Sequence, residues 1–215
     1  MRCLISAGPT WEPLDQVRRL TNFSTGSLGG ELANHLTQAG HEVTLLLSET
    51  ATWNCPLAAV TVRRFSTTAA LRAEFERLAS PRTGAVFHAA AVSDFTGGGA
   101  FQRTELGDLI PVAGGKLSTR SGNLLVELRP TAKLLPELPQ WFPNACVVGW
   151  KYEVDGTHPD ALAAGRRQLA ESRSPACVVN GPAHGPGFTL LRGTGVADTL
   201  PDRLALFAAL EKLTA

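Results

Sequence analysis

The stretch that decides the fold runs from residue 4 to residue 30 and reads LISAGPTWEPLDQVRRLTNFSTGSLGG. Its apolar start, Leu4–Ala7, predicts a buried strand, and its glycine-rich end predicts the first turn of a helix. The free N–H groups and the dipole of such a turn attract anions, and glycines let a ligand come close to the backbone. Two interpretations of this stretch alone stay open: an ordinary strand–turn–helix with Ser24 or Thr25 as the cap, or a phosphate site.

The composition narrows the class of protein. Hydrophobic residues make up 44% and charged residues 18% of the 215 residues, which is the profile of a soluble globular chain with a sizeable core. A net charge of +1 without a basic run argues against a nucleic-acid partner, and no apolar run is long enough to span a membrane. The four cysteines lack Cys-x-x-Cys spacing, and three of them lie in or beside apolar runs. We interpret them as buried thiols in a reducing compartment, so we expect a cytoplasmic protein.

Short apolar runs alternate with helical patterns along most of the chain. This alternation is typical of a doubly wound parallel sheet, so we predict an α/β, Rossmann-like fold with ligands at the carboxyl ends of its strands. The expected strands cover residues 2–7, 43–47, 60–62, 85–87, 146–149 and 176–179, and the expected helices cover 27–39, 69–78 and 159–171. We also expect a short helix that begins with Pro130–Lys133, an edge strand at 188–191 and a last helix over 200–213.

The alternation breaks between residues 95 and 128, where two glycine clusters stand among few periodic apolar positions. The first part predicts a long loop, which is typical of a functional lid or a disordered insert. The second part predicts a hairpin in which Lys116–Ser118 pairs with Leu124–Leu128 around a turn at Ser121–Asn123. We therefore expect a single domain over residues 1–215 that carries a flap at about 95–128.

Polar residues follow four of the expected strands, at Thr10, Asp94, Glu153 and Asn180. Because the carboxyl ends of parallel strands meet at one edge of a sheet, we expect these residues to surround one site. The small residues of Ala89–Ala91 would leave room for a ligand there, although alanines also suit tight helix–sheet packing and Asp94 could cap a turn.

Several segments resemble one family of enzymes. The most specific are residues 7–18 (AGPTWEPLDQVR), 22–26 (NFSTG) and 90–95 (AAVSDF), and shorter ones follow in family order at 116–118, 130–134, 149–153 and 178–180. Together they resemble phosphopantothenoylcysteine synthetase, the phosphopantothenate–cysteine ligase of coenzyme A synthesis. The resemblance implies two steps. The carboxylate of 4′-phosphopantothenate attacks the α-phosphate of CTP or ATP in the presence of Mg²⁺, and the amine of cysteine then displaces the nucleotide.

The resemblance also assigns roles to residues. Asn22 is expected to orient the substrate and donate a hydrogen bond to its carbonyl oxygen, and Lys116 is expected to contact the nucleotide and support the second step. The nucleotide-binding positions are Gly8, Thr10, Ser24, Gly26, Gly29, Lys116, Thr131, Ala132, Lys133, Leu134, Trp150, Arg167 and Asn180. The substrate-binding positions are Asn22, Ala90, Ala91 and Asp94, and no metal ligand is assigned.

The sequence departs from the family at two of these positions. Trp150 replaces a phenylalanine, and Arg167 stands where the bacterial branch has lysine. Lys116 resembles the bacterial branch, whereas residues 150–153 resemble the archaeal and eukaryotic ones, so the choice between CTP and ATP stays open. The resemblance further implies a homodimer and allows for a separate flavin-dependent decarboxylase as a partner.

Two other functions are compatible with the pattern. An NAD(P)-dependent oxidoreductase would use Glu49, near the end of the second expected strand, to bind a ribose. However, no G-x-G-x-x-G follows the first strand, and Tyr152 lacks a lysine four positions later. A non-catalytic nucleotide-binding relative is the other alternative. Thermal-shift measurements with CTP, ATP, NAD and NADP would distinguish these functions, because a ligand of the native state raises its melting temperature.

Overall fold

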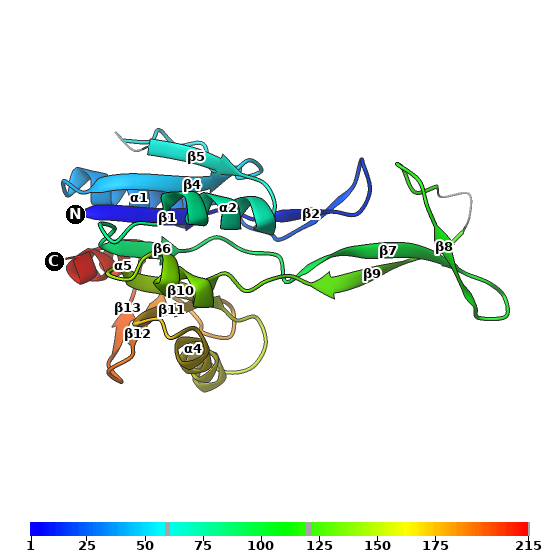
Figure 1. Cartoon of the computed structure of the whole chain (residues 1–215). Helices are drawn as coiled ribbons and strands as arrows, with labels where there is room; N and C mark the ends of the chain where they lie inside the picture. The colour runs from blue at the N-terminus through cyan, green and yellow to red at the C-terminus, as the bar shows by residue number, and fades with distance from the viewer. Residues whose placement is uncertain (59–60, 119–121, 215) are drawn as a thin grey trace.

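The computed structural model describes residues 1–58, 61–118 and 122–214. Its main sheet contains β1 (Arg2–Ala7), β4 (Glu42–Ser48), β5 (Thr61–Phe65), β6 (Ala85–His88), β10 (Cys146–Tyr152), β11 (Ala176–Asn180), β12 (Phe188–Arg192) and β13 (Ala197–Leu200). Their order in the eight-stranded sheet is β13-β12-β11-β10-β6-β1-β4-β5 (Figure 1). Residue 60, the first of the third expected strand, lies outside the described residues.

The strands from β11 to β5 pair in parallel, and β12 and β13 extend the sheet in antiparallel fashion. Taken in chain order, the parallel strands are arranged 3-2-1-4-5-6, the order of a doubly wound Rossmann sheet. The predicted fold class is therefore confirmed. The strand expected at 188–191 is present as β12, but its expected place at the edge of the sheet is wrong, because β13 lies beyond it. β13 is short and alternates exposed with half-buried residues, so it has no apolar run to mark it.

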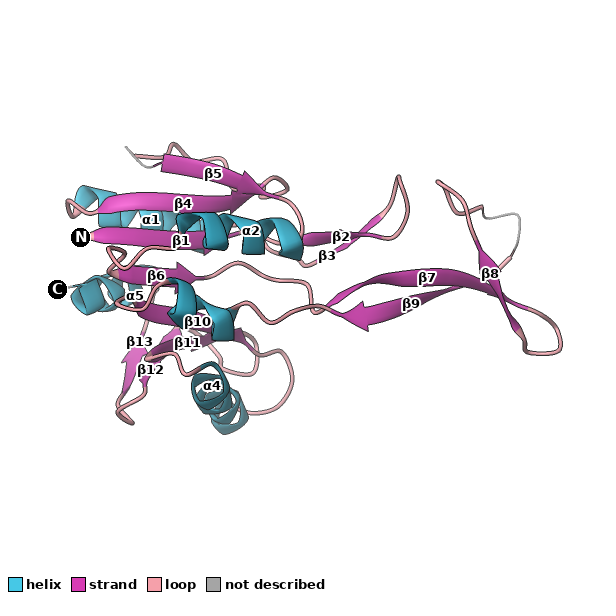
Figure 2. Ribbon diagram, in the orientation of Figure 1, coloured by secondary structure: helices cyan, strands magenta, loops and turns pink. Residues whose placement is uncertain are grey.

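Helices cover both faces of the main sheet (Figure 2). They are α1 (Ser27–Gln38), α2 (Thr68–Leu78), α3 (Leu138–Trp141), α4 (His158–Ser172) and α5 (Arg203–Glu211), with short 3₁₀ turns η2 (Leu135–Glu137) and η3 (Lys212–Thr214). Successive side chains of a strand point to opposite faces. Ile5 of β1 thus packs in the cluster that contains residues of α1 and α5, whereas Leu4 packs with residues of α2 and α3.

Two expected helix starts are wrong. Residues 131–134 are not helical, and the first helical turn begins at Leu135. Thr131 bonds instead to the chain after β6, since its N donates to Asp94 O at 3.0 Å. The last helix begins at Arg203 rather than at residue 200, because Asp202 Oδ1 accepts from Ala205 N at 2.8 Å and caps it.

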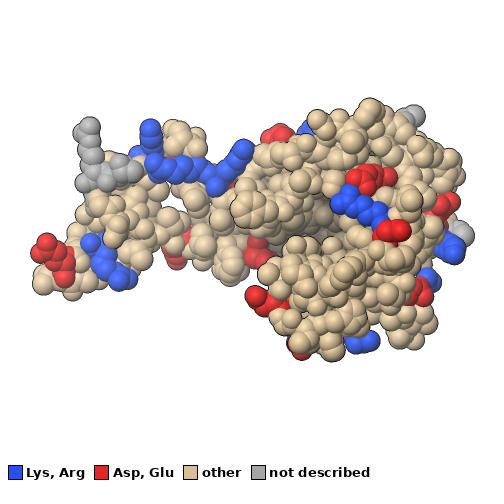
Figure 3. Space-filling view, turned by 180° about the vertical axis from the view of Figure 1, so that it is seen from behind, with Lys and Arg blue, Asp and Glu red and all other residues tan. Residues whose placement is uncertain are grey.

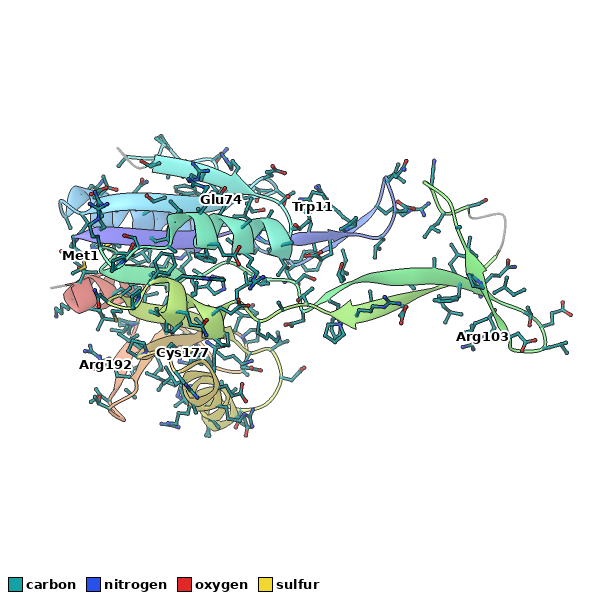
Figure 4. All side chains as sticks on the ribbon, viewed as in Figure 1. Met1, Trp11, Glu74, Arg103, Cys177 and Arg192 are labelled. Atoms are coloured by element: carbon teal, nitrogen blue, oxygen red, sulfur yellow. The ribbon has the colours of Figure 1, made fainter. Side chains whose placement is uncertain are left out.

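The segment between β1 and α1 holds a hairpin that the sequence pattern did not indicate. Its strands are β2 (Trp11–Pro13) and β3 (Arg19–Thr21). They are too short to show an alternation of apolar and polar residues. Trp11, at the start of β2 (Figure 4), lies 5.5 Å from the guanidinium carbon of Arg19, which stacks over its ring.

The described residues of 95–118 and 122–130 contain a separate antiparallel sheet that projects from the main sheet, and we call these residues the arm (Figure 1). It contains β7 (Phe95–Arg103), β8 (Leu109–Val112) and β9 (Leu124–Pro130), in the order β8-β7-β9. The expected loop is therefore wrong. So is the expected hairpin, because β9 pairs with β7 and not with 116–118. Ser121 of the expected turn lies outside the described residues.

The cysteines differ in their surroundings. Cys3 and Cys177 are buried, which raises the pKa of these thiols to about 11 and about 12, and Cys146 is half-buried. Cys55 is exposed, so the expectation of burial is wrong for this thiol. In the part of the chain that the structure describes, no helix combines the length and hydropathy needed to cross a bilayer.

Candidate active site

The order of the parallel strands reverses between β1 and β6, and the two backbones stay paired beyond the strand ends. Ala91 N donates to Gly8 O at 3.0 Å, and Thr10 N donates to Ala91 O at 3.1 Å. Doubly wound sheets bind ligands in the crevice at such a switch point. Gly8 and Ala91, which the resemblance assigns to nucleotide and substrate, therefore lie side by side where a ligand is expected.

The N-terminus of α1 opens beside this point without a side-chain cap. Gly26 is the N-cap residue with a left-handed φ of 80°, and the first turn carries no acidic residue. Thr25 Oγ1 accepts from Ser27 N at 3.2 Å, but the N-cap position is Gly26, so the interpretation of Ser24 or Thr25 as the cap is wrong. Such a turn keeps backbone N–H groups for an anion.

Gly29 of the same helix serves packing. A Cβ at this position would lie 2.5 Å from the Cβ of Ala7, so only glycine lets α1 approach β1 this closely. This contact places the helix N-terminus at the end of β1.

Thr10 is fully buried, and its hydroxyl is used inside the protein. Its Oγ1 accepts from Ser93 N at 2.7 Å and from Thr68 Oγ1 at 3.3 Å. Because the side chain is buried, it has no exposed surface for the expected contact with a nucleotide. Instead, Thr10 fixes the path of the chain that follows β6.

Asn22 connects the segment that leads into α1 with the segment that follows β6. Its Nδ2 donates to Ala91 O and to Val92 O, both at 3.1 Å. The amide hydrogens are therefore directed at main-chain carbonyls, and within the described residues no partner is found for Oδ1. A substrate carbonyl that bound to Nδ2 would have to replace one of these bonds.

The structure also brings together the expected residues at the base of the arm. Lys133 and Asp94 form an ion pair between two exposed side chains. Thr131 Oγ1 donates to Ser93 O at 2.5 Å. Ala132 is exposed, whereas the side chain of Leu134 is buried in the apolar cluster under α2 and α3 and cannot face a ligand.

Trp150 and Asn180 lie at the carboxyl ends of the neighbouring strands β10 and β11. Asn180 follows Val178, the register partner of Trp150, by two positions, so both side chains are on the face that packs against α1 and α5. Trp150 Nε1 and Asn180 Oδ1 are buried, with no hydrogen-bond partner among the described residues. Buried polar atoms without partners cost free energy, so a ligand that satisfied them would be bound favourably.

Arg167 is not part of this group. It is exposed on α4, and this helix packs on the opposite face of β11, against Cys177 and Val179. Lys116 is exposed on the segment that follows β8, and its neighbours contact the β2–β3 hairpin.

Nothing in the sequence pattern indicated the buried pair of side chains at the switch point, Ser6 and His88. Ser6 Oγ lies 2.7 Å from His88 Nδ1 and also accepts from Ala90 N at 3.4 Å. His88 is 7% exposed, and this burial lowers its pKa to about 4, so the ring is neutral at pH 7. The pair supports the chain that carries Ala90 and Ala91.

The surface of the described residues is hollowed at the base of the arm and also at a distance from it. Seen from behind, the body of the protein has a hollow near the base of the arm (Figure 3). Cavities of about 390 Å³ and 350 Å³ lie elsewhere, around Arg192, Gly193 and Val196. They are far in the fold from the carboxyl ends of the parallel strands and contain no residue assigned above, so the switch point remains the candidate site.

A family model described as the DNA/pantothenate metabolism flavoprotein C-terminal domain matches residues 1–192. The chain belongs to this family. The bifunctional coenzyme A biosynthesis protein CoaBC of Thermococcus kodakarensis is 28% identical over 179 residues, which are 83% of this chain and 41% of that protein. The chain spans less than half the length of the curated relatives that it matches first.

Solved structures share the fold. The DNA/pantothenate metabolism flavoprotein from Streptococcus pneumoniae superposes with a TM-score of 0.84 at 23% identity, covering 99% of this chain and 97% of that one. A Cab2 variant in complex with phosphopantothenate-cysteine superposes with a TM-score of 0.72 at 18% identity, covering 99% and 84%.

Proposed function

We propose that this chain is a phosphopantothenate–cysteine ligase. The observation that carries the proposal is the convergence of the three specific motif segments at the switch point. Gly8 of the first segment pairs with Ala91 of the third, and Asn22 of the second donates to Ala91 O and Val92 O. The relatives named for coenzyme A biosynthesis and the Cab2 complex with phosphopantothenate-cysteine support the same substrate class.

In the proposed reaction, a carboxylate oxygen of 4′-phosphopantothenate attacks the α-phosphorus of CTP or ATP and pyrophosphate leaves. The cysteine nitrogen then attacks the acyl carbon, loses a proton, and the nucleoside monophosphate leaves. The uncapped N-terminus of α1 at Gly26 would hold phosphate oxygens. Trp150 and Asn180 would satisfy their unpartnered polar atoms on the nucleotide, and the Trp150 ring offers a stacking surface.

Mg²⁺ would enter with the triphosphate. Sites of this kind hold Mg²⁺ through phosphate oxygens and one or two carboxylates rather than through a cage of protein ligands. No group of three or more His, Cys, Asp or Glu residues comes together in the described part of the chain. Asp94 is the exposed carboxylate at the switch point that could supply one oxygen, if Lys133 moves toward the phosphates.

We further propose that two copies of the chain associate through the arm, which forms one functional unit with the main sheet. Large apolar side chains are exposed along all its strands: Phe95, Leu109, Ile110, Leu125, Val126 and Leu128. Patches of this kind on a soluble protein mark contact surfaces. We also propose that the protein is cytoplasmic. A separate flavin-dependent decarboxylase is the partner that we propose for it.

The test is a reaction assay with purified protein. Pyrophosphate release should require Mg²⁺, phosphopantothenate and either CTP or ATP, and the amide product should appear in mass spectra only when cysteine is added. Glu49 lies directly after β4, where an oxidoreductase would bind a ribose. Saturation by NADPH without a response to any triphosphate would therefore refute the ligase and favour that alternative.

A further inference from the structure

The turn of the β2–β3 hairpin contacts the chain on both sides of Lys116. Gln16 N donates to Gly115 O at 2.9 Å, and Leu117 N donates to Asp15 Oδ2 at 3.1 Å. Figure 1 shows the tip of the hairpin next to the segment that follows β8. We call these contacts, together with those of Arg18, the clasp.

Asp15 is the centre of the clasp. Its Oδ1 accepts from Val17 N at 2.8 Å and from Arg18 N at 2.7 Å, which closes the hairpin turn. Its Oδ2 accepts from Arg18 Nη1 at 2.9 Å and from Leu117 N. The side chain is 1% exposed, so the carboxylate is fully used by these donors. The hydrogen bond from Leu117 N, more than any other effect, holds the pKa of Asp15 below its ordinary value.

Arg18 closes the contact from the other side. Its Nη2 donates to Leu117 O at 3.1 Å while its Nη1 bonds to Asp15. The N–H and the C=O of Leu117 are therefore both bonded to the hairpin, and its side chain is buried. The backbone is thus held at the two residues that flank Lys116.

Lys116 itself is exposed, and within the described residues its ammonium group has no hydrogen bond or ion pair. Two glycines precede it, and glycine-rich backbone loses much conformational freedom when it is ordered. The clasp orders this backbone before any ligand binds, while the charged end of the side chain stays available.

We propose that Asp15 is a positioning residue for Lys116, which it holds in place through the N–H of Leu117. This inference rests on the proposed function and on the role that the family resemblance implies for Lys116, whose charge would stabilise the nucleotide that leaves in the second step. A charge stabilises a departing group only when it is placed there in the transition state. Release of the clasp therefore slows amide formation and spares pyrophosphate release.

The variant Asp15→Asn separates the two roles of the carboxylate, which closes the hairpin turn and accepts a hydrogen bond from Leu117 N. An asparagine keeps one oxygen for Val17 N and Arg18 N, but it presents an NH₂ group to Leu117 N, which is also a donor. The turn survives and the link to Leu117 is lost. Asp108→Asn is the matched control, because Asp108 is exposed in the arm and the same charge is removed.

The first measurement does not depend on activity. Amide-resolved hydrogen exchange should show Leu117 N protected in the wild-type protein and in Asp108→Asn, and exchanging faster in Asp15→Asn. The second measurement is kinetic. In Asp15→Asn the kcat for amide formation should fall by about tenfold or more with pyrophosphate release retained, and Asp108→Asn should match the wild type. In a Lys116→Gln background Asp15→Asn should cause no further loss, because both changes act through one group.

The outcomes are distinguishable. An unprotected Leu117 amide in the wild-type protein would refute the clasp. The positioning role would also be refuted if Asp15→Asn lowered the kcat for amide formation equally in the wild-type and Lys116→Gln backgrounds. Wild-type protein that forms no amide refutes the proposed ligase, and with it the role of Lys116, even when Leu117 is protected. Melting curves at pH 7 verify that each variant is folded. If Asp15→Asn does not fold, the wild-type exchange and the Lys116→Gln kinetics decide between these outcomes.

Discussion

Lowering the pH from 7 to 4 should destabilise the protein through His88. The ring is neutral and buried, bonded to Ser6 and packed edge-to-face against Phe75, with ring centres 5.5 Å apart. Burial lowers the pKa of His88 from 6.5 to about 4. The unfolded chain therefore binds a proton below pH 6.5 that the native protein does not bind until the pH approaches 4.

The sign and the size follow from proton linkage. A group whose native pKa is depressed, here a histidine that must stay neutral, makes the free energy of unfolding fall as the pH drops below the unfolded pKa. The full shift is worth about 3 kcal/mol, and most of it is lost by pH 4. This is a large part of the 5–15 kcal/mol that is typical of a folded domain.

Urea unfolding followed by tryptophan fluorescence measures this loss. The variant His88→Gln keeps a polar side chain but has no titrating group, so its free energy of unfolding falls less on acidification. The wild-type curve minus the variant curve cancels the carboxylates that titrate in both proteins. The difference should change by about 3 kcal/mol between pH 7 and pH 4. Parallel curves for the two proteins would refute the assignment of a neutral, buried His88.

The remaining predictions concern the site. Asn22→Asp turns a donor into a carboxylate that faces two carbonyl oxygens, so kcat should fall by about 10²-fold in a steady-state assay and the melting temperature should also drop. Wild-type turnover in this variant would show that Asn22 has no catalytic role. Lys116→Gln should let the acyl-nucleotide accumulate after cysteine is added, seen by rapid quench and mass spectrometry, whereas failure before pyrophosphate release would contradict its role. Gly29→Ala should cost about 1–2 kcal/mol of stability in urea unfolding because its Cβ would overlap that of Ala7; unchanged stability would show that α1 shifts freely.

The parts of the fold that could be predicted from the sequence are those in which the buried residues form recognisable apolar runs. Val43–Leu47 and Cys146–Gly149 are apolar runs, and each became a parallel strand of the main sheet. The arm could not be predicted in this way, because Gly97–Gly99 carry no side-chain pattern. β7 is held by backbone pairing, with a register shift between Gly97 and Gly99.

The site shows the same division. The sequence motif indicated that Gly8, Asn22 and Asp94 belong together, and the topology places their segments at one switch point. The motif could not indicate that the Asn22 amide donates to main-chain carbonyls, because every residue carries such a carbonyl and none is marked by its side chain. The burial of Thr10 and of Leu134 was also hidden, because both depend on how distant segments pack.

The central position of β1 has a consequence for how the chain folds during synthesis. Cys3 pairs with Val43 on one side and with Ala85 on the other. A ribosome delivers β4 early, so β1 and β4 can pair while the opposite edge of β1 still presents unpaired N–H and C=O groups. Such an edge invites pairing with other chains until β6 emerges. The strand that leads into the ligand site thus depends on β6, made about 80 residues later, to cover its second edge.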